Sequence, residues 1–143
     1  DFKVPRGIDG RPAESEPLGG LLALLGGLYD EEVRAVYVRG ALSDFQSVLE
    51  SPFVQIPHDV VIPGVLAAGD LPELAAALAP RPLRLEAMVD GLNRRRTDQA
   101  AEQIYAPASA AYRRCDASGQ LKLHAPDAPE PQWLLNHLKR SIQ

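Results

Sequence analysis

The sequence predicts an α/β fold with a three-layer α/β/α arrangement, in which helices cover a mostly parallel sheet. Two observations lead to this prediction. Segments with a helical pattern alternate with short β-rich segments, which is typical of parallel strands joined by crossover helices. In addition, the short apolar segment 83–89 ends at Asp90-Gly91, and a carboxylate on such a turn is typical of the carboxyl end of a buried parallel strand.

The first expected elements are a loop or linker over residues 1–17 and a buried helix over residues 18–29. Proline, glycine and charged residues dominate the first segment, and this composition favours irregular structure. The second is apolar on every side, as expected of a helix buried all round. Its glycines lower the helix propensity, but they allow the backbone to approach a sheet closely.

The remaining expected elements follow from caps and hydrophobic runs. Asp70 and Glu73 form a capping-box pattern at a helix start, and Thr97 is a cap for a later helix that Pro107 is expected to kink. In chain order we expect strand 34–39, helix 43–50, an irregular stretch 51–69, helix 71–79, strand 83–89, helix 97–114, strand 120–124 and helix 132–140. Three strands are few for such a sheet, so we expect further strands upstream or on a partner chain.

Composition excludes several classes of protein. The chain has 143 residues, enough for one domain with a core, and a net charge of −4, which argues against a nucleic-acid partner. We expect no membrane span and no cofactor, because there is no long apolar run, no dinucleotide fingerprint and no phosphate loop. Cys115 stands alone, and the three histidines are too scattered for a metal motif. The start at Asp1 indicates processing, trimming or a longer parent chain. The sequence does not indicate a cellular compartment.

Four segments of the chain resemble a known family. They are Gly19-Gly20 through Ala23, Val33 through Gly40, Ile62 through the Ala-Pro-Arg-Pro step at 79–82, and Val89-Asp90-Gly91. Together they resemble the C-terminal half of α/β-hydrolases of the dienelactone hydrolase and acetyl xylan esterase type. The resemblance runs from about residue 18 to 124, and it implies a partial α/β-hydrolase-like domain over 18–143.

The resemblance also implies roles for individual residues. Asp90 would be the acid and His124 the base of a serine hydrolase triad, in which the acid orients the base. The nucleophile position falls on Pro17, which has no nucleophilic side chain, and Ser15 lacks the flanking glycines of a nucleophile elbow. Each residue also has a plain structural reading, since an Asp-Gly turn after a strand and a histidine at a strand end are both common.

Two functions follow from this resemblance, and a third from charge. The first is a serine ester hydrolase acting on acetylated carbohydrate or a similar small ester, with its nucleophile supplied from elsewhere. The second is a non-catalytic relative that binds or assembles, with a protein partner or another copy of the chain over the exposed sheet edge. The third is a small module that uses Arg94, Arg95 and Arg96 to bind an acidic partner, although such a run is usually a solvated face.

Overall fold

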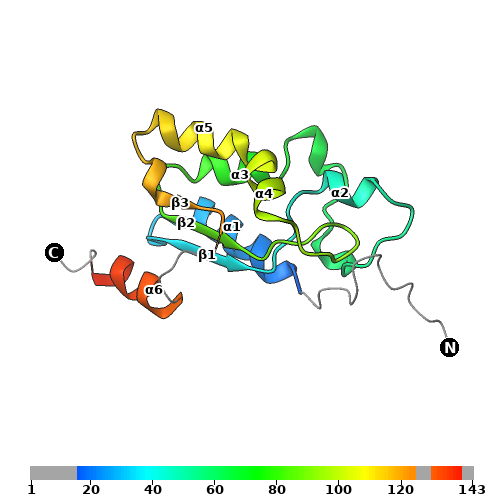
Figure 1. Ribbon diagram of the computed structural model, residues 1–143, viewed down its shortest axis with the longest axis horizontal. Coiled ribbons are helices and arrows are strands. Elements are labelled where there is room, and N and C mark those ends of the chain that lie inside the picture. Colours follow the sequence, from blue (N-terminus) through cyan, green and yellow to red (C-terminus); the bar gives the residue numbers. More distant parts are fainter. Residues whose placement is uncertain (1–15, 125–129, 140–143) are drawn as a thin grey trace.

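The computed structural model describes residues 16–124 and 130–139, so most of the expected linker 1–17 lies outside the described part (Figure 1). The class is α/β, with helices around a small open parallel sheet. The helices are α1 (Leu18–Tyr29), α2 (Gln46–Leu49), α3 (Leu71–Ala77), α4 (Asp98–Ile104), α5 (Ala106–Arg114) and α6 (Glu130–Lys139). Short 3-10 turns lie at η1 (His58–Val60), η2 (Val65–Ala67) and η3 (Ser118–Gln120). The strands are β1 (Val36–Arg39), β2 (Leu83–Glu86) and β3 (Leu121–Lys122).

The sheet has the order β1-β2-β3, and both pairs of neighbours are parallel. Val36 lies opposite Leu83, and Leu83 lies opposite Leu121, so one register line crosses all three strands. The prediction that the segment starting at Leu83 forms a central parallel strand is therefore confirmed. The chain after β2 consequently emerges between two other strand ends.

One face of the sheet carries the hydrophobic core. Helix α1 packs against β1 and α3, and α3 packs against α5. A Cβ on Gly20 would lie 2.4 Å from the Ala41 Cβ, and a Cβ on Gly27 would lie 2.5 Å from a Val36 methyl group. The glycines of α1 that face the sheet thus allow the close approach that the sequence predicts. Buried aliphatic side chains of β1 and β2 complete this core, namely Val36, Val38, Leu83 and Leu85.

The opposite face is polar and is partly covered by α6, which Figure 1 shows on the other side of the sheet from α5. Arg84 is 2 % exposed, and its Nε donates to Glu86 Oε1 at 2.6 Å. The Tyr37 hydroxyl donates to the other oxygen of Glu86 at 3.0 Å. The guanidinium carbon of Arg84 lies 5.9 Å from the ring centre of Trp133, a buried residue of α6. Trp133 therefore anchors α6 through a cation–π contact above a buried ion pair.

Several expected boundaries need correction. The strand predicted over 83–89 ends at Glu86, because Ala87 has a φ of 50° and leaves the extended conformation. The helix predicted over 97–114 is two helices, α4 and α5, which meet at Tyr105, so the predicted kink near Pro107 is a full break two residues before that proline, and Pro107 lies in the first turn of α5. The other helices and strands match in type and order, and their ends move by at most three residues.

Asp70 ties two elements together. It caps α3 by accepting from the Leu71 amide at 2.6 Å, and Glu73 completes the predicted capping box by accepting from the Asp70 amide at 3.0 Å. The Asp70 carboxylate also accepts from the backbone amides of Phe45 and Gln46, where α2 begins. The capping box is confirmed, and the link to α2 is a tertiary contact that the local pattern does not contain.

Candidate functional site

The carboxyl ends of β1 and β2 lead into one polar cluster. The two segments stay paired beyond the strands, with Ser43 N–H donating to Val89 O at 2.8 Å and Val89 N–H donating to Ala41 O at 2.9 Å. Four buried polar side chains gather here, namely Ser43, Asp44, Ser47 and Asp90. The carboxyl edge of a parallel sheet is where α/β proteins commonly place a site, so this cluster is the place to test the predicted acid.

Asp90 is 5 % exposed, and its carboxylate is fully engaged. Oδ1 accepts from the backbone amides of Leu92 and Arg94, both at 2.9 Å. Oδ2 accepts from Nε and Nη2 of Arg94, at 3.0 and 2.8 Å. Burial by itself would raise the pKa of Asp90, but the hydrogen bonds and the charge of Arg94 outweigh it and hold the pKa below the ordinary 3.8. Asp90 is therefore a charged clamp for the loop that follows β2.

His124 follows β3 and has different partners. Its Nε2 lies 3.2 Å from Glu102 Oε1, and its Nδ1 lies 3.8 Å from Asp98 Oδ1. Both carboxylates come from α4 and are largely exposed. Within the described residues, no hydrogen bond or ion pair joins His124 to Asp90. The structure thus places the two predicted site residues after neighbouring strands without bringing their side chains into contact.

Pro17, at the position that the resemblance gives to a nucleophile, is buried. Its backbone is helical, with φ −73° and ψ −10°, and its carbonyl accepts from Gly20 and Leu21 as α1 begins. Pro17 therefore starts a helix and offers no reactive side chain. Ser15 lies outside the described residues.

The arginine run has a structural role that its composition did not reveal. Arg94 is paired with Asp90, and Arg96 Nη2 lies 3.5 Å from Asp44 Oδ2, while its Nε donates to Ser43 at 3.3 Å. Sequence reasoning missed this network, because Ser43 and Arg96 are 53 positions apart. The one local signal for this network was the Ser43-Asp44 pair that follows β1. Arg94 therefore closes the loop after β2 on itself, and Arg96 joins that loop to the loop after β1.

What this cluster can do chemically is limited by its own contacts. An acid that orients a catalytic histidine must have an oxygen free for that histidine, and both Asp90 oxygens are occupied. In the described ranges, no group of three or more histidine, cysteine, aspartate or glutamate side chains could hold a metal ion. In the same ranges, no single helix is long and apolar enough to cross a membrane; one bent pair, His58–Ala67 with Leu71–Ala77, passes by length and composition only.

Comparison with known proteins adds no relative. The chain matches none of the family models, curated proteins or solved structures with which it was compared. The resemblance to α/β-hydrolases consequently depends on the four sequence segments alone.

Proposed function

We propose that this chain is an α/β-hydrolase-like domain, equivalent to the C-terminal half of that fold, that binds or assembles rather than hydrolysing esters. The observation that carries the proposal is the complete engagement of Asp90 by Arg94 and two backbone amides. In this proposal, α6 belongs to the second helical layer of a three-layer α/β/α arrangement. The small parallel sheet is compatible with such a fold, although the α/β class is common to many functions.

The energetic argument runs against catalysis. To join a triad, Asp90 would have to exchange a paired guanidinium for the neutral imidazole of His124. The Arg94 side chain is 43 % exposed, so water would replace much of the lost pairing, and the exchange would cost about 1 kcal/mol. His124 would also have to leave Glu102, and Pro17 would still provide no nucleophile. Three separate changes are therefore needed before acyl transfer could begin.

Ester hydrolysis is the second candidate, and one observation favours it. Asp90 follows the central strand and His124 follows the next one, which is the order that a Ser-Asp-His hydrolase of this type requires. The substrate would be a small or carbohydrate-linked acetyl ester, and the nucleophile would come from outside the described residues. This candidate requires Arg94 to release Asp90 in the active form.

The experiment that separates the two candidates measures hydrolysis and covalent labelling on the same preparation. The protein is incubated with p-nitrophenyl acetate and acetylated xylan, and then with a fluorophosphonate that labels activated serines, followed by intact mass. We expect no rate above that of buffer and no mass increase.

Two variants make the result specific. Asp90→Asn removes the predicted acid, whereas Arg94→Gln removes the same ion pair and keeps the acid. A labelled serine, with a hydrolysis rate that Asp90→Asn abolishes and Arg94→Gln preserves or increases, would overturn the binding proposal. Circular dichroism of both variants shows whether each remains folded.

A further inference from the structure

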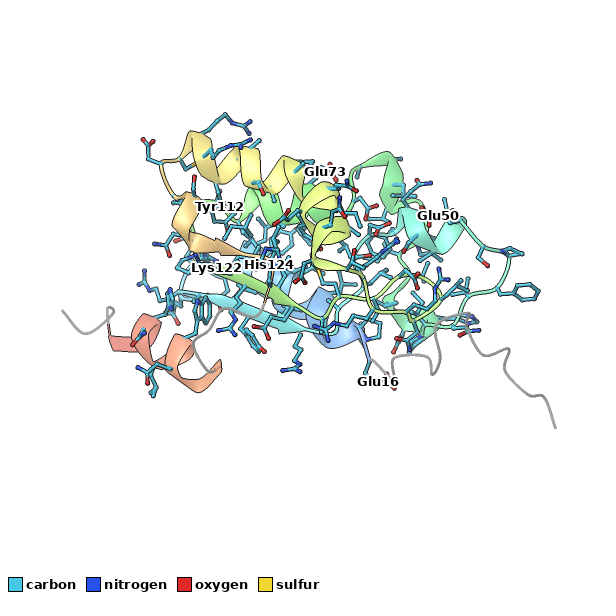
Figure 2. The ribbon with its side chains drawn as sticks, viewed as in Figure 1. Glu16, Glu50, Glu73, Tyr112, Lys122 and His124 are labelled. Carbon is cyan, nitrogen blue, oxygen red and sulfur yellow. The ribbon has the colours of Figure 1, made fainter. Side chains whose placement is uncertain are left out.

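A groove of about 480 Å³ runs along the outer edge of β3. Its walls come from β3 and the chain to His124 on one side, and from α4, α5 and η3 on the other. Figure 2 shows Tyr112 of α5 above Lys122 and His124, so the helix overhangs the end of the sheet. The groove therefore combines a strand edge with a helical wall, which is the geometry that extended peptides use when they add to a sheet.

The hydrogen-bond pattern shows which backbone groups lie on this edge. Val36 N–H donates to Pro82 O, and Gly40 N–H donates to Glu86 O. The carbonyls of Pro82 and Glu86 therefore point toward β1. In a parallel ladder, alternate residues of a strand direct their backbone groups to opposite neighbours. The even-numbered residues of β2 therefore face β1, and its odd-numbered residues face β3.

The same alternation continues into β3. Arg84 lies opposite Lys122, so the backbone of Lys122 is the one that pairs with the odd-numbered residues of β2. The amides and carbonyls of Leu121 and Leu123 consequently face away from β2, into the groove. These four groups are spaced as another strand requires.

The charges at the groove favour an acidic partner. Arg113 of α5 and Lys122 of β3 both line it, and within the described residues neither has an ion-pair partner. Among the described residues of the lining, Glu102 is the one carboxylate, and it is already close to His124. In the described part of the chain, two cations without an ion-pair partner thus flank a strand edge that no further strand covers, although the chain as a whole has a net charge of −4.

We propose that this groove binds an extended, acidic segment of another protein, which adds to the sheet as a strand next to β3. The proposal rests on the proposed binding function and identifies the partner's chemistry. The backbone of the segment pairs with Leu121 and Leu123. Successive side chains of a strand alternate in direction. Of two neighbouring acidic residues in the bound segment, one would therefore reach Arg113 of α5 on one face of the sheet, and the other would reach Lys122 on the opposite face.

The test uses a fluorescein-labelled six-residue peptide with the order valine, glutamate, glutamate, valine, glutamate, glutamate, in which neighbouring glutamates point to opposite faces and which is about 20 Å long when extended. Two matched peptides accompany it, one with glutamine in place of glutamate and one N-methylated at alternate residues. Anisotropy gives the affinity, and hydrogen exchange followed by NMR reports the amides of Leu121 and Leu123. We expect both amides to exchange about tenfold more slowly in the complex, and the N-methylated peptide not to bind.

Charge variants of the whole chain complete the design. Arg113→Glu combined with Lys122→Glu reverses the two groove cations, and we expect about tenfold weaker binding. Arg95→Glu combined with Arg114→Glu changes the net charge equally at exposed positions outside the groove lining. This control should change the affinity by less than about twofold.

Several outcomes would overturn the proposal. These are equal binding of the N-methylated peptide, unchanged exchange at both amides, equal weakening by the two double variants, or no binding at about 1 mM peptide. Protection of the same amides that grows with protein concentration, together with a doubled mass, would assign the edge to a second copy of the chain instead. None of these readouts involves ester hydrolysis, so a failure here is distinct from a failure of the proposed function.

Discussion

The clamp between Asp90 and Arg94 gives the most informative prediction, because it decides between a structural and a catalytic acid. The perturbation is a series of three variants: Asp90→Ala, Asp90→Asn and Arg94→Gln. Asp90→Ala removes four hydrogen bonds from a residue that is 5 % exposed. Asp90→Asn keeps an oxygen for the two backbone amides and loses only the ion pair.

The magnitudes follow from the exposure of each partner. The Arg94 side chain is 43 % exposed, so water replaces much of its lost interaction, and the ion pair contributes about 1 kcal/mol at most. The amides of Leu92 and Arg94 lose a charged acceptor in a partly buried loop, which costs about 1–2 kcal/mol more. We therefore expect a loss of about 2–3 kcal/mol for Asp90→Ala and of about 1 kcal/mol for each of the other two variants.

Urea unfolding, followed by circular dichroism, measures these differences in the free energy of unfolding. Urea unfolding at several pH values also tests how these differences in free energy depend on pH. The folded-state pKa of Asp90 is lower than its ordinary 3.8, so its contribution is present above 3.8 and is lost as the pH falls through the folded value. The gap between the wild type and Asp90→Asn should be constant near neutral pH and should narrow only below about 3.8.

Two results would refute this reasoning. One is an Asp90→Ala protein that loses less than about 0.5 kcal/mol, since the carboxylate would then be dispensable to the loop. The other is a double-mutant cycle of Asp90→Asn with Arg94→Gln that shows no coupling, since the ion pair would then contribute nothing.

Three further predictions concern the core, the caps and the tyrosines. Gly20→Ala should lower the free energy of unfolding by about 1–3 kcal/mol, because the added methyl group overpacks α1 against β1. Gly19→Ala is the control: its added methyl group would have no neighbour within 4 Å, so this variant should be neutral or more stable by up to about 1 kcal/mol. Thermal unfolding of both variants measures the difference. Asp70→Ala should cost about 2 kcal/mol in urea unfolding, because α2 and α3 both lose their acceptor; a loss below about 0.5 kcal/mol would contradict that double role. Burial raises the pKa of Tyr105 and Tyr112 above the ordinary 10, so the stability that they contribute is present below pH 10 and lost as the pH rises further. Their phenolate absorbance should appear only as the protein unfolds, and early titration of all four tyrosines would argue against this.

Local sequence signals predicted much of the secondary structure, because each depended on neighbouring residues. The capping box at Asp70 and the apolar run of α1 are complete within one segment, so their helices begin where the pattern says. The end of β2 was different. The residues up to Val89 favour a strand, but the φ of 50° at Ala87 interrupts it, and pairing resumes only at Val89 as an isolated bridge to Leu42; no local pattern marks that interruption.

The sequence by itself determined the α/β class and the order of the elements, because periodicity, caps and breakers are local properties, whereas Asp90 and His124 became candidate residues through the resemblance to α/β-hydrolases. Only the tertiary structure decided how those residues are used. Asp90 meets Arg94 four positions later, and His124 meets the carboxylates of α4, because the turns after β2 and β3 direct each side chain toward its own partner. Side-chain pairing depends on where separate segments meet in space, and that is decided by the packing of the whole chain.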